Sequence, residues 1–265
     1  MNTTVSKKAK DAIGRAAALT GAFARDFRSK MLIVTFHRVS DELPEDGLTC
    51  SSARFAAFCE FFRRHFKVIS LSEQVAGCRA GYDMGGTLSI SFDDGYGDNA
   101  LVAAPILHSR GLPATFFVMT GYIGTQNVAP WDREMSQPPA WMDWDQLRAL
   151  VAQGFEIGSH TDSHIDMGTA DEQTVRAELE VSRGKLQQQL GTPIRLFAYP
   201  YGGRENITGP AVEAVRDAGF VCCAGCFGGI NPPVGADPFA LRRITIGQGF
   251  LTPAQFGVDV ILGRV

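Results

Sequence analysis

The chain has 265 residues and a mass of 28.6 kDa, and 45% of its residues are hydrophobic while 20% are charged. This composition is typical of a globular protein with a sizeable core and excludes a disordered chain. The formal net charge of −3, without any block of like charges, gives no electrostatic reason to expect nucleic acid as a partner, and no stretch approaches the ~18 apolar residues that cross a bilayer.

A basic segment near the N-terminus is the first predicted element. Its apolar part ends in Ala22-Phe23-Ala24, which is consistent with a weak signal peptide cleaved there or with a basic amphipathic helix. Because Asp11 interrupts the basic part, we favour the helix and a cytoplasmic location. Such a helix either caps the domain or rests on an anionic membrane, here the inner-membrane face, through residues 5–28. We therefore divide the chain into an N-terminal helix or appendage (1–28) and one main domain (29–265).

From residue 31 onward, short apolar runs alternate with amphipathic segments. The predicted strands are 31–36, 87–92, 114–119, 155–158, 195–198 and 220–223, and the predicted helices are 51–65, 98–109, 144–153, 171–190 and 210–218. Such a repeated alternation predicts a parallel sheet with helices outside it, hence one α/β, barrel-like domain. Residues 124–143 hold several prolines and tryptophans without periodicity and are predicted to form a long loop.

Two adjacent carboxylates follow the predicted strand 87–92. Asp93 and Asp94 precede Gly95, at the carboxyl end of a strand, where the catalytic groups of barrels lie. Carboxylates side by side repel each other, so the pair requires a cation or a shared proton. A turn without function is the alternative that these residues alone leave open.

Two of the five histidines, His160 and His164, follow the predicted strand 155–158. If the loop between them makes a helical turn, both imidazoles share a face and can bind one metal ion. With a carboxylate of the Asp pair they form a His-His-Asp set, which leaves a position for water, as a catalytic metal requires. Incidental histidines on a surface turn are the alternative.

The predicted strand 195–198 ends in Tyr199-Pro200-Tyr201-Gly202. Proline and glycine make this turn rigid, so it can aim the backbone N–H of Tyr201 at a reaction centre as an oxyanion donor. Turns of this composition also occur without any function.

Six cysteines are too few for a disulfide scaffold, and the adjacent pair Cys222-Cys223 favours free thiols in a reducing compartment. The spacing of Cys223 and Cys226 matches half of a zinc site or a redox pair, but no second pair completes it. We therefore expect these side chains to fill a tight strand as small apolar groups.

Taken together and in this order, three motifs resemble those of the polysaccharide deacetylase family, also called the NodB-homology domain or carbohydrate esterase family 4. They are Ser91-Phe92-Asp93-Asp94-Gly95, His160-Thr161-Asp162-Ser163-His164 and Phe197-Ala198-Tyr199-Pro200-Tyr201-Gly202. The resemblance covers about residues 31–250. It implies a distorted (β/α)7-type barrel, with residues 29–265 as a single deacetylase domain.

The resemblance also implies a mechanism. Asp94, His160 and His164 would hold a divalent metal, with Zn²⁺ the expected ion, and Asp93 would be the general base that takes a proton from the attacking water. The ion and the Tyr201 N–H would share the negative charge on the oxygen of the tetrahedral intermediate. A general acid would then protonate the departing amine.

Two departures from the family pattern affect the choice of residues. No histidine follows His164, so we assign the general acid to His37, which ends the first predicted strand and resembles the N-terminal histidine of permuted deacetylases of exopolysaccharide synthesis. Ala198 stands where the third motif commonly has arginine, so an arginine from elsewhere must orient Asp93. Since neighbouring strand residues face opposite sides, one of Arg242 and Arg243 can point into the site, and Arg243 matches the family better.

The predicted enzyme is a polysaccharide N-deacetylase, a hydrolase of linear amide bonds. Its partner would be an N-acetylated exopolysaccharide of the N-acetylglucosamine type or its lipid-linked oligosaccharide precursor. A deacylase of peptidoglycan, chitooligosaccharides or lipid-linked sugars and a non-catalytic sugar-binding relative remain alternatives. Aromatic residues of the long loop can stack on sugar rings or pack in the core; they are Tyr122, Trp131, Trp141 and Trp144.

Overall fold

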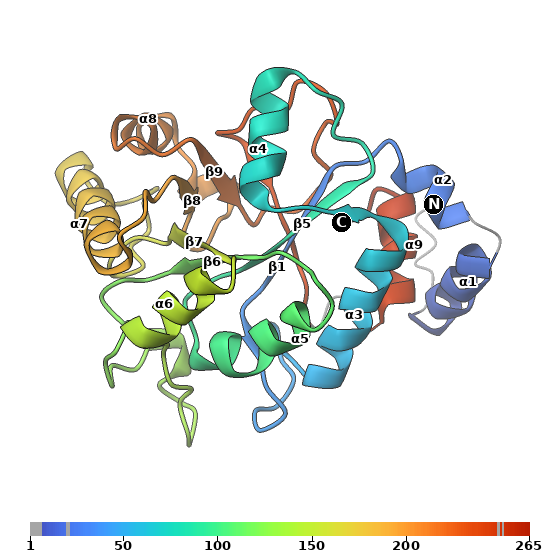
Figure 1. The fold of residues 1–265 in the computed structure, drawn as a ribbon, viewed down its shortest axis with the longest axis horizontal. Helices are drawn as coiled ribbons and strands as arrows, with labels where there is room; N and C mark the ends of the chain where they lie inside the picture. The colour runs from blue at the N-terminus through green and yellow to red at the C-terminus, as the bar shows by residue number, and fades with distance from the viewer. Residues whose placement is uncertain (1–6, 20–21, 248–249, 251) are drawn as a thin grey trace.

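A computed structural model describes residues 7–19, 22–247, 250 and 252–265 (Figure 1). Within these residues, nine strands form one sheet in which every neighbouring pair is parallel. Eight of them follow the order β10-β9-β8-β7-β6-β5-β1-β11, and β4 pairs with β5. The strands are β1 (Leu32–Phe36), β4 (Lys67–Val68), β5 (Thr87–Phe92), β6 (Thr115–Val118), β7 (Glu156–Ser159), β8 (Leu196–Ala198), β9 (Cys222–Gly225), β10 (Leu241–Arg242) and β11 (Ile244–Thr245).

The two edge strands of this path are consecutive in the chain and are separated only by Arg243. β10 pairs with β9, whereas β11 pairs with β1 at the other end of the path. The segment 241–245 therefore joins both edges, and the sheet is nearly closed into a barrel. The predicted α/β barrel fold is confirmed.

The predicted helices are present, with ends shifted by a residue or two, but the segment 98–109 begins as a π-helix (Asn99–Ala103) before α5 (Ala104–His108). The others are α3 (Ser52–His65), α6 (Trp144–Ala152), α7 (Glu172–Leu190) and α8 (Gly209–Asp217). Some elements were not predicted from the sequence: α4 (Leu71–Ala80), α9 (Pro253–Ile261), the short strands β4, β10 and β11, and a separate pair, β2 (Arg38–Val39) and β3 (Thr49–Cys50). Strands of two residues are too short to show alternation.

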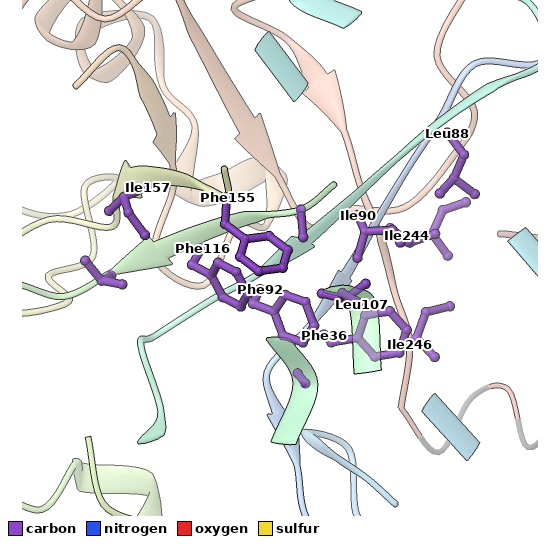
Figure 2. Close-up of a cluster of buried hydrophobic side chains, with 14 of the residues drawn as sticks. Phe36, Leu88, Ile90, Phe92, Leu107, Phe116, Phe155, Ile157, Ile244 and Ile246 are labelled. Atoms are coloured by element: carbon purple, nitrogen blue, oxygen red, sulfur yellow. The ribbon is translucent and has the colours of Figure 1, made fainter. Parts of the chain in front are cut away.

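Alternate residues of the strands face two different environments. Phe36, Phe92 and Phe116 lie opposite one another in β1, β5 and β6, and their rings stack at centroid distances of 5.6 and 4.9 Å, in a cluster that also contains Leu107 of α5 (Figure 2). The intervening Thr35 and Ser91 lie on the other face, where their hydroxyl groups accept hydrogen bonds from Arg243. Near the carboxyl ends of these strands the sheet thus buries stacked aromatic rings on one face and polar groups on the other, where Ile33 and Phe117 of a second apolar cluster also lie.

The N-terminal region contributes two helices to this fold, α1 (Lys7–Leu19) and α2 (Ala22–Phe27). α1 packs along α9, where Lys10 Nζ lies 2.7 Å from Asp259 Oδ1 (Figure 1). In α2, Phe23 and Phe27 are fully buried. The described part of segment 1–28 therefore packs on the barrel; residues 1–6 and 20–21 lie outside the described residues, and the domain boundary at residue 28 stays a prediction.

Replacing Gly14 with valine is expected to lower the free energy of unfolding by about 1–3 kcal/mol, because a Cβ at this position would lie 2.4 Å from the Ala254 carbonyl oxygen of α9. Urea unfolding of wild type and Gly14→Val measures this free energy. The control is Ala12→Val, because Ala12 lies on the exposed side of α1. Equal loss of stability in the two variants would contradict the packing of α1 on α9.

Candidate active site

The three motifs meet in one cavity of about 350 Å³ at the carboxyl ends of the strands. Its lining contains six of the seven predicted site residues, and the seventh, Arg243, contacts Asp93. The lining residues are His37, Leu48, Asp93, Asp94, Trp131, His160, His164, Tyr199, Tyr201, Cys226 and Thr245. A larger cavity of about 920 Å³ lies beside α4 and contains none of the predicted site residues.

The backbone of all three motifs is strained. Among the described residues, the four non-glycine residues with positive φ all belong to these motifs: Asp94 (74°), Thr161 (64°), His164 (61°) and Tyr201 (60°). Residues other than glycine seldom adopt a positive φ, and backbone strain of this kind is common at functional sites. The expected helical turn between His160 and His164 is therefore wrong; a strained loop brings the two rings together instead.

Asp94, His160 and His164 form a compact cluster. Asp94 Oδ1 lies 3.5 Å from His160 Nε2 and 3.6 Å from His164 Nε2, and the three candidate ligand atoms all lie within 4.8 Å of one another. On its other side, His160 Nδ1 lies 2.8 Å from the Ala198 carbonyl oxygen. Because a carbonyl oxygen only accepts, His160 donates from Nδ1, and its Nε2 lone pair faces Asp94.

The charges of this cluster fit a divalent cation. Burial lowers the pKa of His160, and it lowers that of His164 to about 2, so both rings are neutral and can act as ligands. Burial, together with the neighbouring Asp93 carboxylate, raises the pKa of Asp94 well above its usual range. No lysine or arginine of the described residues forms an ion pair with Asp94, and a buried carboxylate of this kind beside two imidazole lone pairs is a donor set suited to zinc.

Asp93 has the opposite environment. Arg243 binds it with both terminal nitrogens, Nη1 to Oδ1 at 2.6 Å and Nη2 to Oδ2 at 2.8 Å, and both side chains are buried. Burial alone would raise the pKa of Asp93, but the charge of Arg243, the neighbouring His160 and His37 and the hydrogen bonds from Arg243 together outweigh burial and lower the pKa to about 2. Asp93 is therefore an ionised base at neutral pH. Arg242 instead lies beside the Phe227 ring, at 6.0 Å from its centroid.

His37 extends into the cavity from the end of β1. Its Nδ1 is buried and has no hydrogen-bond partner among the described residues. Burial lowers its pKa to about 4, partly opposed by the Asp93 carboxylate, so the free protein holds a neutral imidazole at pH 7. The backbone here is fixed by the π-helical region, since Asn99 Nδ2 donates to the His37 carbonyl oxygen at 2.7 Å and Asp98 Oδ1 accepts from Val39 N at 3.1 Å.

Replacing Asp98 with asparagine is expected to raise the free energy of unfolding above that of wild type by on the order of 2 kcal/mol more at pH 8 than at pH 4. Burial raises the pKa of Asp98 to about 6, so the carboxyl group favours folding below pH 4 and this contribution is lost as pH rises through 6. Asparagine keeps the acceptor for Val39 N without ionising. Urea unfolding at both pH values measures the difference; a gain equal at both would contradict it.

Two aromatic side chains flank His164. The ring centroids of Trp131 and Tyr201 lie 4.6 and 4.7 Å from that of His164. Trp131 Nε1 donates to Tyr96 Oη at 2.7 Å, and this hydroxyl donates in turn to the buried carboxylate of Asp132 at 2.8 Å. Tyr201 is 58% exposed, and none of the described residues accepts a hydrogen bond from its backbone N–H. That N–H is therefore available to a substrate oxygen.

The other aromatic residues of the long loop do not line the cavity. Trp141 is buried and stacks on Tyr96 at a centroid distance of 4.6 Å. Tyr122 packs on Trp141, and Trp144 begins α6 and packs against the main core. Of the four, only Trp131 lines the cavity.

The cavity wall also contains Cys226, Thr245 and Leu48, which were not predicted as site residues. Cys226 Sγ lies 3.1 Å from Arg243 Nη2 and 3.8 Å from Asp93 Oδ2, and burial raises its pKa to about 11. Its position just after β9 was the available signal. All six cysteines are free, as their composition indicated.

A sequence model of polysaccharide deacetylases matches residues 81–222. A putative polysaccharide deacetylase, YxkH of Bacillus subtilis (strain 168), is 27% identical over 176 residues, which cover 64% of this chain and 55% of that relative. A gellan lyase of Bacillus sp is 30% identical over 136 residues, or 51% of this chain and 5% of that protein. The chain thus spans little more than half the length of the first relative and a small part of the second.

Solved structures share the fold. IcaB from Ammonifex degensii has a TM-score of 0.72 at 21% identity and covers 89% of this chain and 98% of its own. A de-N-acetylase from Aggregatibacter actinomycetemcomitans has a TM-score of 0.70 at 20% identity and covers 89% of this chain and 100% of its own. The deacetylase PplD of Streptococcus pyogenes has a TM-score of 0.69 at 20% identity and covers 86% of this chain and 96% of its own. At these identities the likeness establishes a common barrel.

Proposed function

The chain belongs to the polysaccharide deacetylase family, and from this premise we propose that it hydrolyses N-acetyl groups of amino-sugar residues. The substrate would be an exopolysaccharide of the N-acetylglucosamine type or its lipid-linked precursor. The observation that carries the proposal is the pairing, in one cavity, of a buried Asp-His-His cluster with a second carboxylate held ionised by Arg243. A binding module would have no use for such a base.

In this proposal Asp94, His160 and His164 hold a divalent ion, with zinc the expected one. When bound, such an ion polarises a carbonyl group and makes water more acidic. Asp93 stands beside the cluster and is not needed as a ligand, because Arg243 already binds both of its oxygens. Of the two neighbouring carboxylates, Asp94 therefore serves as a ligand and Asp93 as the base.

The remaining steps belong to the chain's own groups. Asp93 accepts a proton from the attacking water, and the free N–H of Tyr201 donates to the carbonyl oxygen of the substrate as negative charge develops there. His37 gives a proton to the departing amine. Although burial lowers the pKa of His37 to about 4, negative charge on the substrate beside it favours the protonated ring.

We also propose a cytoplasmic location, with peripheral membrane contact through residues 5–28 where the substrate is lipid-linked. Ile13 supports this contact, because its side chain is 51% exposed on α1, whose other side packs on α9. Among the described residues, the helices are too short or too polar to span a bilayer.

Acetate release from an N-acetylglucosamine oligomer tests the activity. A chelator is expected to stop it and added Zn²⁺ to restore it. His37→Ala is expected to lower the rate by a factor of about 10²–10⁴, whereas His108→Ala, at an exposed site outside the cavity, leaves it unchanged. No release from zinc-loaded protein on polymeric and lipid-linked substrates would contradict the proposed function.

A further inference from the structure

The loop that carries the two histidines is held from outside the cavity by α7. We propose that Glu178 of α7 is a positioning residue that sets the affinity of the Asp94-His160-His164 site for its divalent ion, an inference that rests on the proposed function. Glu178 Oε2 accepts hydrogen bonds from the backbone N–H groups of Asp162 and Ser163 at 2.7 and 2.8 Å, and Oε1 accepts from Ser163 Oγ at 2.5 Å.

The loop needs such support because its backbone is strained at both ends. Thr161 and His164 have φ values of 64° and 61°, a conformation that costs on the order of 1–3 kcal/mol per residue and persists only where the surroundings impose it. The two N–H groups that Glu178 binds lie between these residues. Without the carboxylate, both donors would lose their acceptor and the loop could relax toward ordinary backbone angles.

The side chain and the carbonyl group of Asp162 fix the loop as well. The Asp162 carboxylate accepts from Lys185 Nζ of α7 at 2.7 Å and from the Thr120 hydroxyl, and the Asp162 carbonyl oxygen accepts from Gly121 N at 2.8 Å. A Cβ at Gly121 would lie 2.7 Å from that carbonyl oxygen, so the approach is close. The loop is therefore clamped between α7 and the segment after β6, and Glu178 makes three bonds of this clamp.

Glu178 has no evident role in forming its own helix. α7 is capped by Asp171, whose side chain accepts from Thr174 N, and Glu178 lies two turns further along. Both of its oxygens are directed to the loop. The interaction thus acts on the geometry of His160 and His164, and residues that orient metal ligands typically change affinity by about 10–100-fold when replaced.

The experiment compares Glu178→Gln with Glu180→Gln. Both changes remove one negative charge from the same helix, but Glu180 is exposed, and no described residue of the loop bonds to it. Affinity for Zn²⁺ is measured by competition with a chelating dye, and Co²⁺ spectra report the ligand geometry. We expect about 10–100-fold weaker binding and an altered Co²⁺ spectrum for Glu178→Gln, because the uncharged amide oxygen holds the two backbone N–H groups less strongly than the carboxylate oxygen Oε2 does. No change is expected for Glu180→Gln.

The outcomes separate this inference from the proposal beneath it. If wild-type protein binds zinc, His164→Ala does not, and Glu178→Gln binds as wild type, the role of Glu178 is wrong while the site stands. A lower melting temperature of metal-free Glu178→Gln with unchanged zinc affinity would also overturn it, leaving a structural role. If His160→Ala and His164→Ala bind zinc as wild type does, the proposed metal site itself is wrong.

Discussion

Replacing Asp93 with asparagine is expected to reduce acetate release by a factor of about 10²–10⁴ in a protein that stays folded and still binds zinc. Asparagine has the shape of aspartate but cannot accept a proton from water at neutral pH. The wild-type carboxylate can, because Arg243, together with His160 and His37, lowers its pKa to about 2 against the effect of burial.

Initial rates and zinc content of the purified variant measure this effect together. Asp145→Asn is the control, since the Asp145 side chain is 90% exposed on α6 and lies outside the cavity; its rate should match wild type. An Asp93→Asn variant that keeps both its zinc and its activity would show that another group is the base.

Replacing Arg243 with methionine is expected to lower the free energy of unfolding at pH 7 by about 3–5 kcal/mol, because it leaves the Asp93 carboxylate buried without its partner. The guanidinium group is completely buried, and it also donates to Thr35 and Ser91 on the polar face of the sheet. Activity should fall as well, since the pKa of Asp93 rises when the positive charge is removed.

The free energy of unfolding that Arg243→Met loses should be smaller at low pH than at pH 7. The pKa of Asp93 is about 2 in the folded protein and about 3.9 in an unfolded chain, so the pair stabilises fully above pH 4 and its contribution is lost as pH falls toward 2. The gap between wild type and Arg243→Met should therefore narrow below pH 4.

Urea unfolding at pH 7 and pH 3 measures this gap. Arg242→Met, which removes the neighbouring and partly exposed arginine, should cost much less, and Arg243→Met combined with Asp93→Asn should recover part of the stability. A double variant no more stable than Arg243→Met would contradict the buried charge as the cause.

Much of the cavity was predictable because strand ends are visible in sequence. The apolar run 87–92 places Asp93 and Asp94 at a carboxyl end, and parallel strands bring such ends to one edge. Alternation likewise indicated that only one of Arg242 and Arg243 points into the site, and the resemblance to the family selected Arg243. The local sequence pattern was sufficient to predict a site residue wherever the direction of its side chain depends only on its own strand.

What was missed depends on contacts between distant segments. The positive φ values of Asp94, Thr161 and His164 are imposed by surrounding bonds, such as those from α7, and no local propensity predicts them. Cys226 enters the cavity because of how β9 ends against the turn at Gly202, whose carbonyl oxygen accepts from Cys226 N at 2.7 Å. These features belong to the assembled barrel.

The segment that joins the two edges of the sheet also makes the charge of the base depend on closure of the barrel. Asp94, His160 and His164 follow β5 and β7, near the middle of the path, whereas Arg243 lies between β10 and β11, which pair at the two opposite ends of the path. An opening of the sheet at this segment would take Arg243 away from Asp93 without separating β5 from β7. Closure of the barrel is therefore coupled to the ionisation of Asp93.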